Sequence, residues 1–172
     1  MEGGPENFAG RYPGEVMLTE ALAWSSNVAA WKLFEQLTPE YGMSFVKRMH
    51  FRRAGEDEHY MAACLGGWSY GASALEMASG YAALENDGIY REPTAVMRIT
   101  DSKGRLIVDN GGSDTAIYDK NAARMVSKML QYGVEYVIAT GAQLNDAIVA
   151  VKTGTTTDNK DGWTVGYSAY YT

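Results

Sequence analysis

Residue types that bind anions follow one another near the C-terminal end of the sequence. Segment 149–157 begins with alternating small and β-branched residues, as a strand would, and continues with Lys152, Thr153, Gly154 and Thr155. Side chains alternate faces along a strand, so Lys152 and Gly154 should point one way and Thr153 and Thr155 the other. The glycine lets a ligand approach backbone N–H groups that bind an oxyanion or a peptide carbonyl. We expect an anion site on a strand edge; the alternative is a surface strand with one lysine.

A second polar group, Ser25, Ser26 and Asn27, separates two stretches with helical character, 19–24 and 28–37. Serine and asparagine bond to nearby backbone and disfavour helix interiors, so a break or a cap is expected here. On a structural interpretation, Asn27 caps the second helix. On a chemical one, the Ser25 hydroxyl relays a proton and the Asn27 amide binds a substrate amide in a cleft.

Ser44 and Lys47 match the S-x-x-K pattern of acyl-serine enzymes, in which a lysine one helical turn away assists the nucleophile. They lie on an amphipathic helix that should begin at Thr38-Pro39. Any helical serine followed three residues later by a lysine matches the pattern, so we do not assign Ser44 as a nucleophile.

The composition is that of a globular protein and argues against nucleic acid as a partner. The 172 residues are 46% hydrophobic and 21% charged, with a formal net charge of −6 and no run of basic residues. The single cysteine, Cys64, excludes an internal disulfide. His50 and His59 lack metal-ligand spacing, so the sequence predicts no metal and no cofactor.

The chain reads as one domain or part of a larger one. No apolar run is long enough to cross a bilayer, and residues 1–18 lack the basic and apolar pattern of a signal peptide. The polar, glycine-rich residues 1–5 are typical of a start inside a longer chain. Any anchoring or secretion segment of the parent protein is expected elsewhere.

The elements that must position the two polar groups can be predicted from caps and periodicity. Thr19 should cap the helix that ends at Trp24, and residues 52–60 should form a polar loop. Ser73 and Glu76 form a capping box for a helix that stops at residues 86–88. Segments 94–100 and 105–109 read as a β-hairpin.

A further helix should begin at Asp119, and its inner face should include Ala122, Met125, Val126, Met129 and Leu130. Gly133 and Gly141 should bracket a loop that leads into the lysine strand. After a turn at 158–162, residues 163–171 alternate as a second strand, antiparallel to the first.

S-x-N followed by K-T-G on a strand resembles the serine penicillin-binding proteins and serine β-lactamases. The wider sequence resembles the transpeptidase domain of class A, bifunctional penicillin-binding proteins, from about Gly10 to Tyr167. The matching segments are GEVMLTEALAWSSN (14–27), LGGWSYGASALEMA (65–78), GIY (88–90), KTGTT (152–156) and DGWTVGY (161–167). Each motif is short, but their combination and order are specific.

The resemblance implies an α+β fold in which helices pack on a mainly antiparallel sheet. In this family a serine attacks the D-Ala-D-Ala bond of a peptidoglycan stem peptide and passes the acyl group to an amine, and β-lactams acylate the same serine. Mapped by motif, Ser25 and Lys152 join the proton relay and Asn27 binds the substrate amide. Thr153, Gly154 and Thr155 line the substrate site, with both hydroxyls on its carboxylate and the Thr155 N–H in the oxyanion hole.

The sequence departs from the family at the nucleophile. The family's S-x-x-K lies upstream of S-x-N, but residues 1–24 contain neither serine nor lysine. We therefore expect residues 1–172 to be a partial transpeptidase domain that is inactive alone. Missing strand partners would leave unpaired edges, and self-association through them is a hypothesis.

Two other functions remain open at this point. One is a serine β-lactamase or β-lactam sensor, which shares K-T-G. The sequence around residues 65–67 and 75–78 favours the transpeptidase over this alternative. The other is a non-catalytic module that binds peptidoglycan or a partner. The resemblance also implies that the parent protein is membrane-anchored and works on the outer face of the cytoplasmic membrane.

Overall fold

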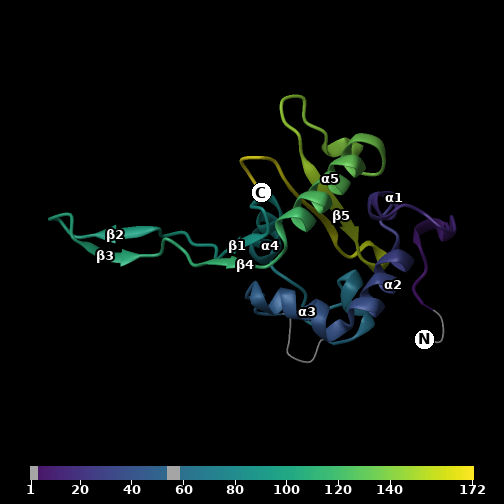
Figure 1. The fold of residues 1–172 in the computed structure, drawn as a ribbon, viewed down its shortest axis with the longest axis horizontal. Helices are drawn as coiled ribbons and strands as arrows, with labels where there is room; N and C mark the ends of the chain where they lie inside the picture. Colours follow the sequence, from purple (N-terminus) through teal and green to yellow (C-terminus); the bar gives the residue numbers. More distant parts are fainter. Residues whose placement is uncertain (1–3, 54–58) are drawn as a thin grey trace.

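A computed structural model describes residues 4–53 and 59–172 as helices around a long β-hairpin, with a second ribbon projecting outward (Figure 1). The α-helices are α1 (Leu18–Ala23), α2 (Asn27–Leu37), α3 (Pro39–Arg48), α4 (Ala74–Glu85) and α5 (Lys120–Tyr136). The strands are β1 (Ile89–Arg91), β2 (Arg98–Thr100), β3 (Leu106–Asp109), β4 (Asp114–Ala116), β5 (Ala150–Thr155) and β6 (Gly162–Tyr167). The 3₁₀ turns are η1 (Phe8–Gly10), η2 (Met61–Leu65), η3 (Thr140–Ala142) and η4 (Thr157–Asn159).

Parts of two predicted segments, the opening 1–5 and the polar loop 52–60, lie outside the described residues. The α+β fold class is confirmed. The strands form three separate two-stranded antiparallel pairs, β1–β4, β2–β3 and β5–β6. The β2–β3 pair is the predicted hairpin in a shorter form, and its ribbon extends away from the helices (Figure 1).

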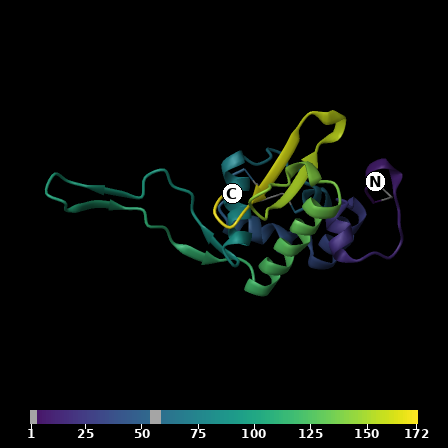
Figure 2. The same ribbon diagram turned by 90° about the horizontal axis from the view of Figure 1, so that it is seen from above.

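The predicted lysine strand is β5, and it pairs antiparallel with β6 from Ala150↔Tyr167 to Thr155↔Gly162. Helix α5 packs on β5, and α1 packs on α5, so three distant segments lie side by side (Figures 1 and 2). The second strand was predicted to continue to Tyr171, which is wrong. The chain turns after Tyr167, where the Ser168 hydroxyl accepts hydrogen bonds from two following backbone N–H groups.

Three of the predicted helix starts are confirmed by side-chain caps. Ser73 Oγ accepts from Glu76 N at 3.2 Å while a Glu76 carboxylate oxygen accepts from Ser73 N at 2.7 Å. Asp119 Oδ1 accepts from two N–H groups of α5, and Thr38 Oγ1 accepts from Tyr41 N. These caps satisfy donors that a helix leaves unpaired at its N-terminus.

The predicted cap at Thr19 is wrong. Helix α1 begins at Leu18, and Met17 occupies the N-cap position. The Glu20 carboxylate accepts from Met17 N at 3.3 Å, so a charged side chain inside the first turn replaces a capping hydroxyl.

The predicted loop into the lysine strand is present but starts later than expected, because α5 continues through Gly133 to Tyr136 and among the described residues only the short η3 turn lies between Tyr136 and β5. Gly133 packs against α1, because a Cβ at position 133 would lie 3.7 Å from Cβ of Ala23, at ordinary van der Waals contact. Tertiary packing overrides the weak helix propensity of glycine here. The inner face of α5 is also shifted, because Ala122 and Met125 are exposed while Ala123, Leu130, Gly133 and Val134 are buried.

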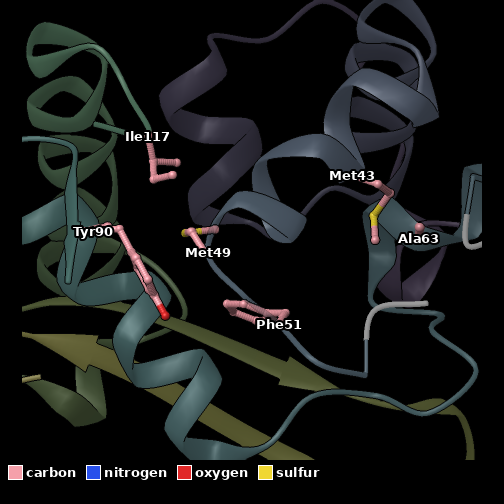
Figure 3. Packing of buried hydrophobic residues seen from close by; sticks show 7 residues of the cluster. Met43, Met49, Phe51, Ala63, Tyr90 and Ile117 are labelled. Atoms are coloured by element: carbon pink, nitrogen blue, oxygen red, sulfur yellow. The ribbon is translucent and has the colours of Figure 1, made fainter. Parts of the chain in front are cut away.

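Two groups of buried side chains fix the elements relative to one another. The larger group joins the end of α3 to α4, β1 and η2 (Figure 3), and its members are Met43, Met49, Phe51, Ala63, Ala83, Tyr90 and Ile117. A smaller group of Leu130, Ala150 and Tyr167 fastens α5 to the β5–β6 hairpin. The start of β5 is therefore anchored in the core, immediately before Lys152.

Gly166 is a position where we expect a single methyl group to disturb this anchor. It pairs with Val151, and a Cβ there would lie 2.7 Å from Val151 Cγ2 and 2.9 Å from the Ala150 backbone oxygen. Because neither neighbour can move without shifting β5, Gly166→Ala should lower the free energy of unfolding by about 2 kcal/mol. Urea denaturation would measure this, with Gly141→Ala, which meets open space, as the matched control.

Within the described residues, no helix has the length and apolar character needed to span a membrane. Across residues 4–53 and 59–172, the His, Cys, Asp and Glu side chains form no group of three or more that could hold a metal ion.

Candidate functional site

Ser25 lies at a sharp corner between α1 and α2, in a backbone conformation that non-glycine residues rarely adopt. Its φ is 56°, in the left-handed region. Ser25 N donates to Leu22 O at 3.0 Å and Ser26 N donates to Ala21 O at 2.9 Å. This is the Schellman pattern that ends helices, and Ser25 occupies the position where glycine is usual. The chain therefore accepts backbone strain to place a hydroxyl at the corner.

The strain predicts opposite behaviour for two substitutions that both remove the hydroxyl. Glycine adopts the left-handed conformation freely, whereas alanine keeps the unfavourable contact of its Cβ. Ser25→Gly should therefore be about 1 kcal/mol more stable than Ser25→Ala in chemical denaturation. A Ser25→Ala protein as stable as Ser25→Gly would show that the corner is unstrained.

Lys152 reaches this corner from β5 across 127 residues of sequence. Its Nζ donates to Ser25 Oγ at 2.7 Å and to the backbone oxygen of Thr153 at 2.6 Å. Burial lowers the pKa of the Lys152 amine, and among the described residues no carboxylate forms an ion pair with it. A half-buried cation with two neutral acceptors leaves part of its charge uncompensated, which favours an incoming anion.

Strand β5 runs from the core to the surface through the predicted motif. Ala150 and Val151 are buried, Lys152 and Thr153 are half-buried, and the two following residues, Gly154 and Thr155, are exposed. A Cβ at Gly154 would stay 3.9 Å from the nearest described atom, in Trp163, so this stretch of strand is open to a ligand. The structure thus puts the threonine hydroxyls and the lysine on one short segment at the edge of the hairpin.

Asn27 is the first residue of α2, and its predicted role as the helix cap is wrong. The cap is Ser26, whose Oγ accepts from Ala29 N at 3.3 Å. The Asn27 side chain instead donates from Nδ2 to the backbone oxygen of Glu6 at 2.8 Å. Because an asparagine amide has two N–H bonds, one remains available for another acceptor.

The structure brings Ser25 and Lys152 into direct contact, and it keeps Ser44 elsewhere. Ser44 lies on α3, which packs on α2 and η2, and its Oγ donates to Tyr41 O at 2.6 Å within its own helix. Lys47 Nζ lies 3.4 Å from Nε2 of His59. The S-x-x-K match therefore belongs to a different part of the fold from the Lys152 corner.

Two residues at the corner escaped the sequence analysis. Glu6 and Asn7 bond to the segment Ser26–Val28 through a backbone oxygen and a side chain. They lie in an irregular, polar N-terminal stretch, and no periodicity or spacing connects them with residues some twenty positions later.

The corner combines the half-buried ammonium of Lys152, the Ser25 hydroxyl in contact with it, the Asn27 amide as a donor and the exposed edge of β5. This set can bind a carboxylate, orient a peptide by its backbone and pass a proton between Ser25 and Lys152.

Comparison with known proteins shows the family of the chain over nearly its whole length. The family model described as "Penicillin binding protein transpeptidase domain" matches residues 6–171. The chain is 28% identical to penicillin-binding protein 4 of Bacillus subtilis, over 98% of this chain and 27% of that protein. It is 31% identical to penicillin-binding protein 1A of Clostridium acetobutylicum, over 97% of this chain and 21% of that protein.

Among solved structures, PonA1 from Mycobacterium tuberculosis in complex with penicillin V superposes with a TM-score of 0.80. The identity is 27%, and the match covers 95% of this chain and 48% of that one. The chain thus spans about a quarter of the length of the two curated relatives and about half of this structure.

Proposed function

Since the chain belongs to the penicillin-binding protein transpeptidase family, we propose that its corner site serves D,D-transpeptidation of peptidoglycan by binding a stem peptide that ends in D-Ala-D-Ala. The observation that carries the proposal is the 2.7 Å contact between Lys152 Nζ and Ser25 Oγ. It joins the two motifs at one place and leaves an ammonium that has no carboxylate partner among the described residues, beside an open strand edge.

Each residue then has a defined task. The terminal carboxylate of the peptide lies at the edge of β5 against the Thr153 and Thr155 hydroxyls, and the Lys152 cation, whose side chain leaves the other face of the strand, attracts it across that edge. The second N–H of Asn27 donates to a peptide carbonyl. The Thr155 N–H points at the scissile carbonyl oxygen and stabilises the negative charge that develops there.

The acyl step needs a nucleophile that these residues do not supply. A serine oxygen attacks the carbonyl carbon of the penultimate D-alanine, and the amine of the terminal D-alanine leaves with a proton. An acceptor amine then opens the ester and returns a proton to the serine. Ser25 and Lys152 would carry these protons, while the attacking serine would be none of the 172 residues.

The same site would take β-lactams, because these compounds carry a carboxylate next to a reactive amide that imitates the peptide. The penicillin V complex of PonA1, which is 27% identical to this chain, supports this extension. We further propose that the parent protein works on the outer face of the cytoplasmic membrane, where peptidoglycan strands are cross-linked, and that residues 1–172 form part of its transpeptidase domain.

The proposal is tested by titrating N-acetyl-D-alanyl-D-alanine into the ¹⁵N-labelled chain and following the amide signals of residues 152–155. The acid should bind at least about tenfold more tightly than the same dipeptide with a C-terminal carboxamide, because only the acid carries the charge that pairs with Lys152. Equal affinities, or shifts confined to other surfaces, would exclude a carboxylate site here. Binding of the peptide without covalent chemistry in any longer form of the protein would instead favour a non-catalytic peptidoglycan-binding module.

A further inference from the structure

The N-terminal segment crosses the start of α2 and bonds to three consecutive residues of the corner. Asn7 Oδ1 accepts from Val28 N at 3.0 Å and from Ser26 Oγ at 3.2 Å. The neighbouring Glu6 backbone oxygen accepts from Asn27 Nδ2 at 2.8 Å. These bonds connect residues that lie 19 to 21 positions apart.

The Asn7 side chain is itself held in place, because its Nδ2 donates to the backbone oxygen of Arg11 at 2.8 Å. Both halves of the amide are therefore used, which fixes its orientation: the oxygen faces α2 and the nitrogen faces the N-terminal segment. Because its oxygen and its nitrogen are both hydrogen-bonded, the Asn7 amide has a narrower range of orientations than a free surface side chain.

Asn7 also completes the N-terminus of α2. The first N–H groups of a helix have no partner within the helix, and here Ser26 caps Ala29 N while Asn7 caps Val28 N. The Ser26 hydroxyl donates its proton to Asn7 while accepting from Ala29, so the capping oxygen is oriented by Asn7. Removing Asn7 leaves one helix donor unpaired and the capping hydroxyl free to rotate.

The hydrogen bonds from Asn7 hold the segment that follows the strained residue Ser25. Ser25 keeps its left-handed conformation only if both flanking segments are held, and strained residues persist where their surroundings over-determine them. The Ser26 N bond to Ala21 O holds the corner on the α1 side. The bonds from Asn7 hold it on the α2 side.

We infer that Asn7 is a positioning residue that acts through Ser26 and Val28 to keep Ser25 against Lys152 and Asn27 turned toward the substrate. The inference rests on the proposed function and adds a residue to it. Glu6 contributes through its backbone only: it takes one N–H of Asn27, so a substrate carbonyl receives the other.

A double-mutant cycle distinguishes positioning from a general contribution to folding. In the 172-residue chain, Asn7→Ala, Ser25→Ala and the double variant are compared by two measurements at a temperature where all are folded. The first is the affinity for N-acetyl-D-alanyl-D-alanine, and the second is the pKa of the Lys152 amine, followed by NMR of ¹³C-labelled lysine. Asn7→Ala should weaken binding about tenfold, as loss of two hydrogen bonds at the corner implies.

In the Ser25→Ala background the same Asn7 substitution should change affinity less than in the unaltered chain, because the part of its effect that passes through Ser25 is already lost and only the part that passes through Asn27 remains. The Lys152 pKa should move in the same direction in Asn7→Ala and Ser25→Ala. The matched control is Ser73→Ala, which removes a helix cap of similar strength on α4 and should lower stability without altering affinity or the Lys152 pKa. If Asn7→Ala does not fold, Asn7→Gln, which displaces the amide by one methylene, takes its place.

If Asn7→Ala behaves like Ser73→Ala, or if its effects add fully to those of Ser25→Ala, the inference is wrong while the proposed function stands. If the unaltered chain does not bind the dipeptide, the proposed function fails. The Lys152 pKa then decides on Asn7 independently, because it reports the Ser25 contact without any ligand.

Discussion

Lys152→Met is expected to abolish binding of a D-Ala-D-Ala carboxylate and, at the same time, to stabilise the fold near neutral pH. The Lys152 ammonium is half-buried, burial lowers its pKa, and the two oxygens that accept hydrogen bonds from it, Ser25 Oγ and Thr153 O, are neutral. Methionine has a similar length and no charge, so it removes the desolvation penalty while filling the same space. The ligand loses its cation, and affinity should fall by at least about 100-fold, the range for a desolvated charge pair.

The pH dependence of this effect has a defined sign. Because the Lys152 pKa is lower in the folded than in the unfolded chain, the unfolded chain binds more protons between the two values. Stability of the unaltered chain therefore rises with pH through that window, up to the ordinary lysine pKa of about 10.4. The advantage of Lys152→Met should be largest below the lowered pKa and should shrink as the pH approaches that upper limit.

Urea denaturation at several pH values, together with dipeptide titration, measures both effects. Lys103→Met is a suitable control, because Lys103 lies in the exposed turn between β2 and β3, far along the projecting ribbon (Figure 1). It should leave affinity and the pH profile unchanged. A Lys152→Met protein that is less stable at neutral pH, or that still binds the dipeptide acid in preference to its amide, would contradict the proposed site.

The sequence alone predicts the elements whose signals are local. The caps at Thr38, Ser73 and Asp119 are read correctly because a capping side chain and the N–H that it accepts from lie within one turn. The alternation that leads into Lys152 likewise marks β5 and β6 as paired strands. For the caps, the sequence holds both partners of the interaction within a few residues; for β5 and β6, each strand carries its own alternation.

The errors arise where a distant segment decides the local structure. Gly133 looks like a helix end, yet it is buried against Ala23 of α1 and the helix continues through it to Tyr136. Asn27 looks like a cap, but Ser26 takes that role and the Asn27 amide turns to Glu6. Tertiary contacts of this kind leave no periodic signal in a single sequence.

In the candidate site, too, the residue types can be predicted from the sequence, whereas the contacts between them depend on the fold. The residue types at Ser25 and Lys152 predict an anion-binding, proton-relaying pair, but their 2.7 Å contact depends on α1, α5 and β5 being layered together. The role of Asn7 requires the path of the N-terminal segment, which neither propensity nor motif specifies. Chemistry-bearing residues can thus be named from the sequence, whereas their supporting residues emerge only from the fold.

The strongest test of the chemistry is covalent labelling, and the 172-residue chain is expected to stay unlabelled by a fluorescent penicillin on a denaturing gel. Acylation needs a serine oxygen whose proton is removed by a neighbouring base, and removal of a serine nucleophile lowers kcat by roughly 10⁶-fold in serine proteases. The sequence has a single S-x-x-K match, Ser44 with Lys47 on α3, and there the serine hydroxyl donates a hydrogen bond to Tyr41 O. Ser25 contacts Lys152 but sits in the strained corner as its hydrogen-bond acceptor.

A labelled band would overturn this expectation, and two substitutions would then locate the acylated residue. If Ser44→Ala removes the label, the α3 serine is reactive in spite of its bond to Tyr41. If Ser25→Ala removes it, the corner serine attacks directly and the relay assigned to it is wrong. If the unaltered chain stays unlabelled and still binds the dipeptide in a way that depends on Lys152, the two results have one consistent explanation. These residues recognise and orient the substrate, and the attacking oxygen must reach the open edge of β5 from another segment.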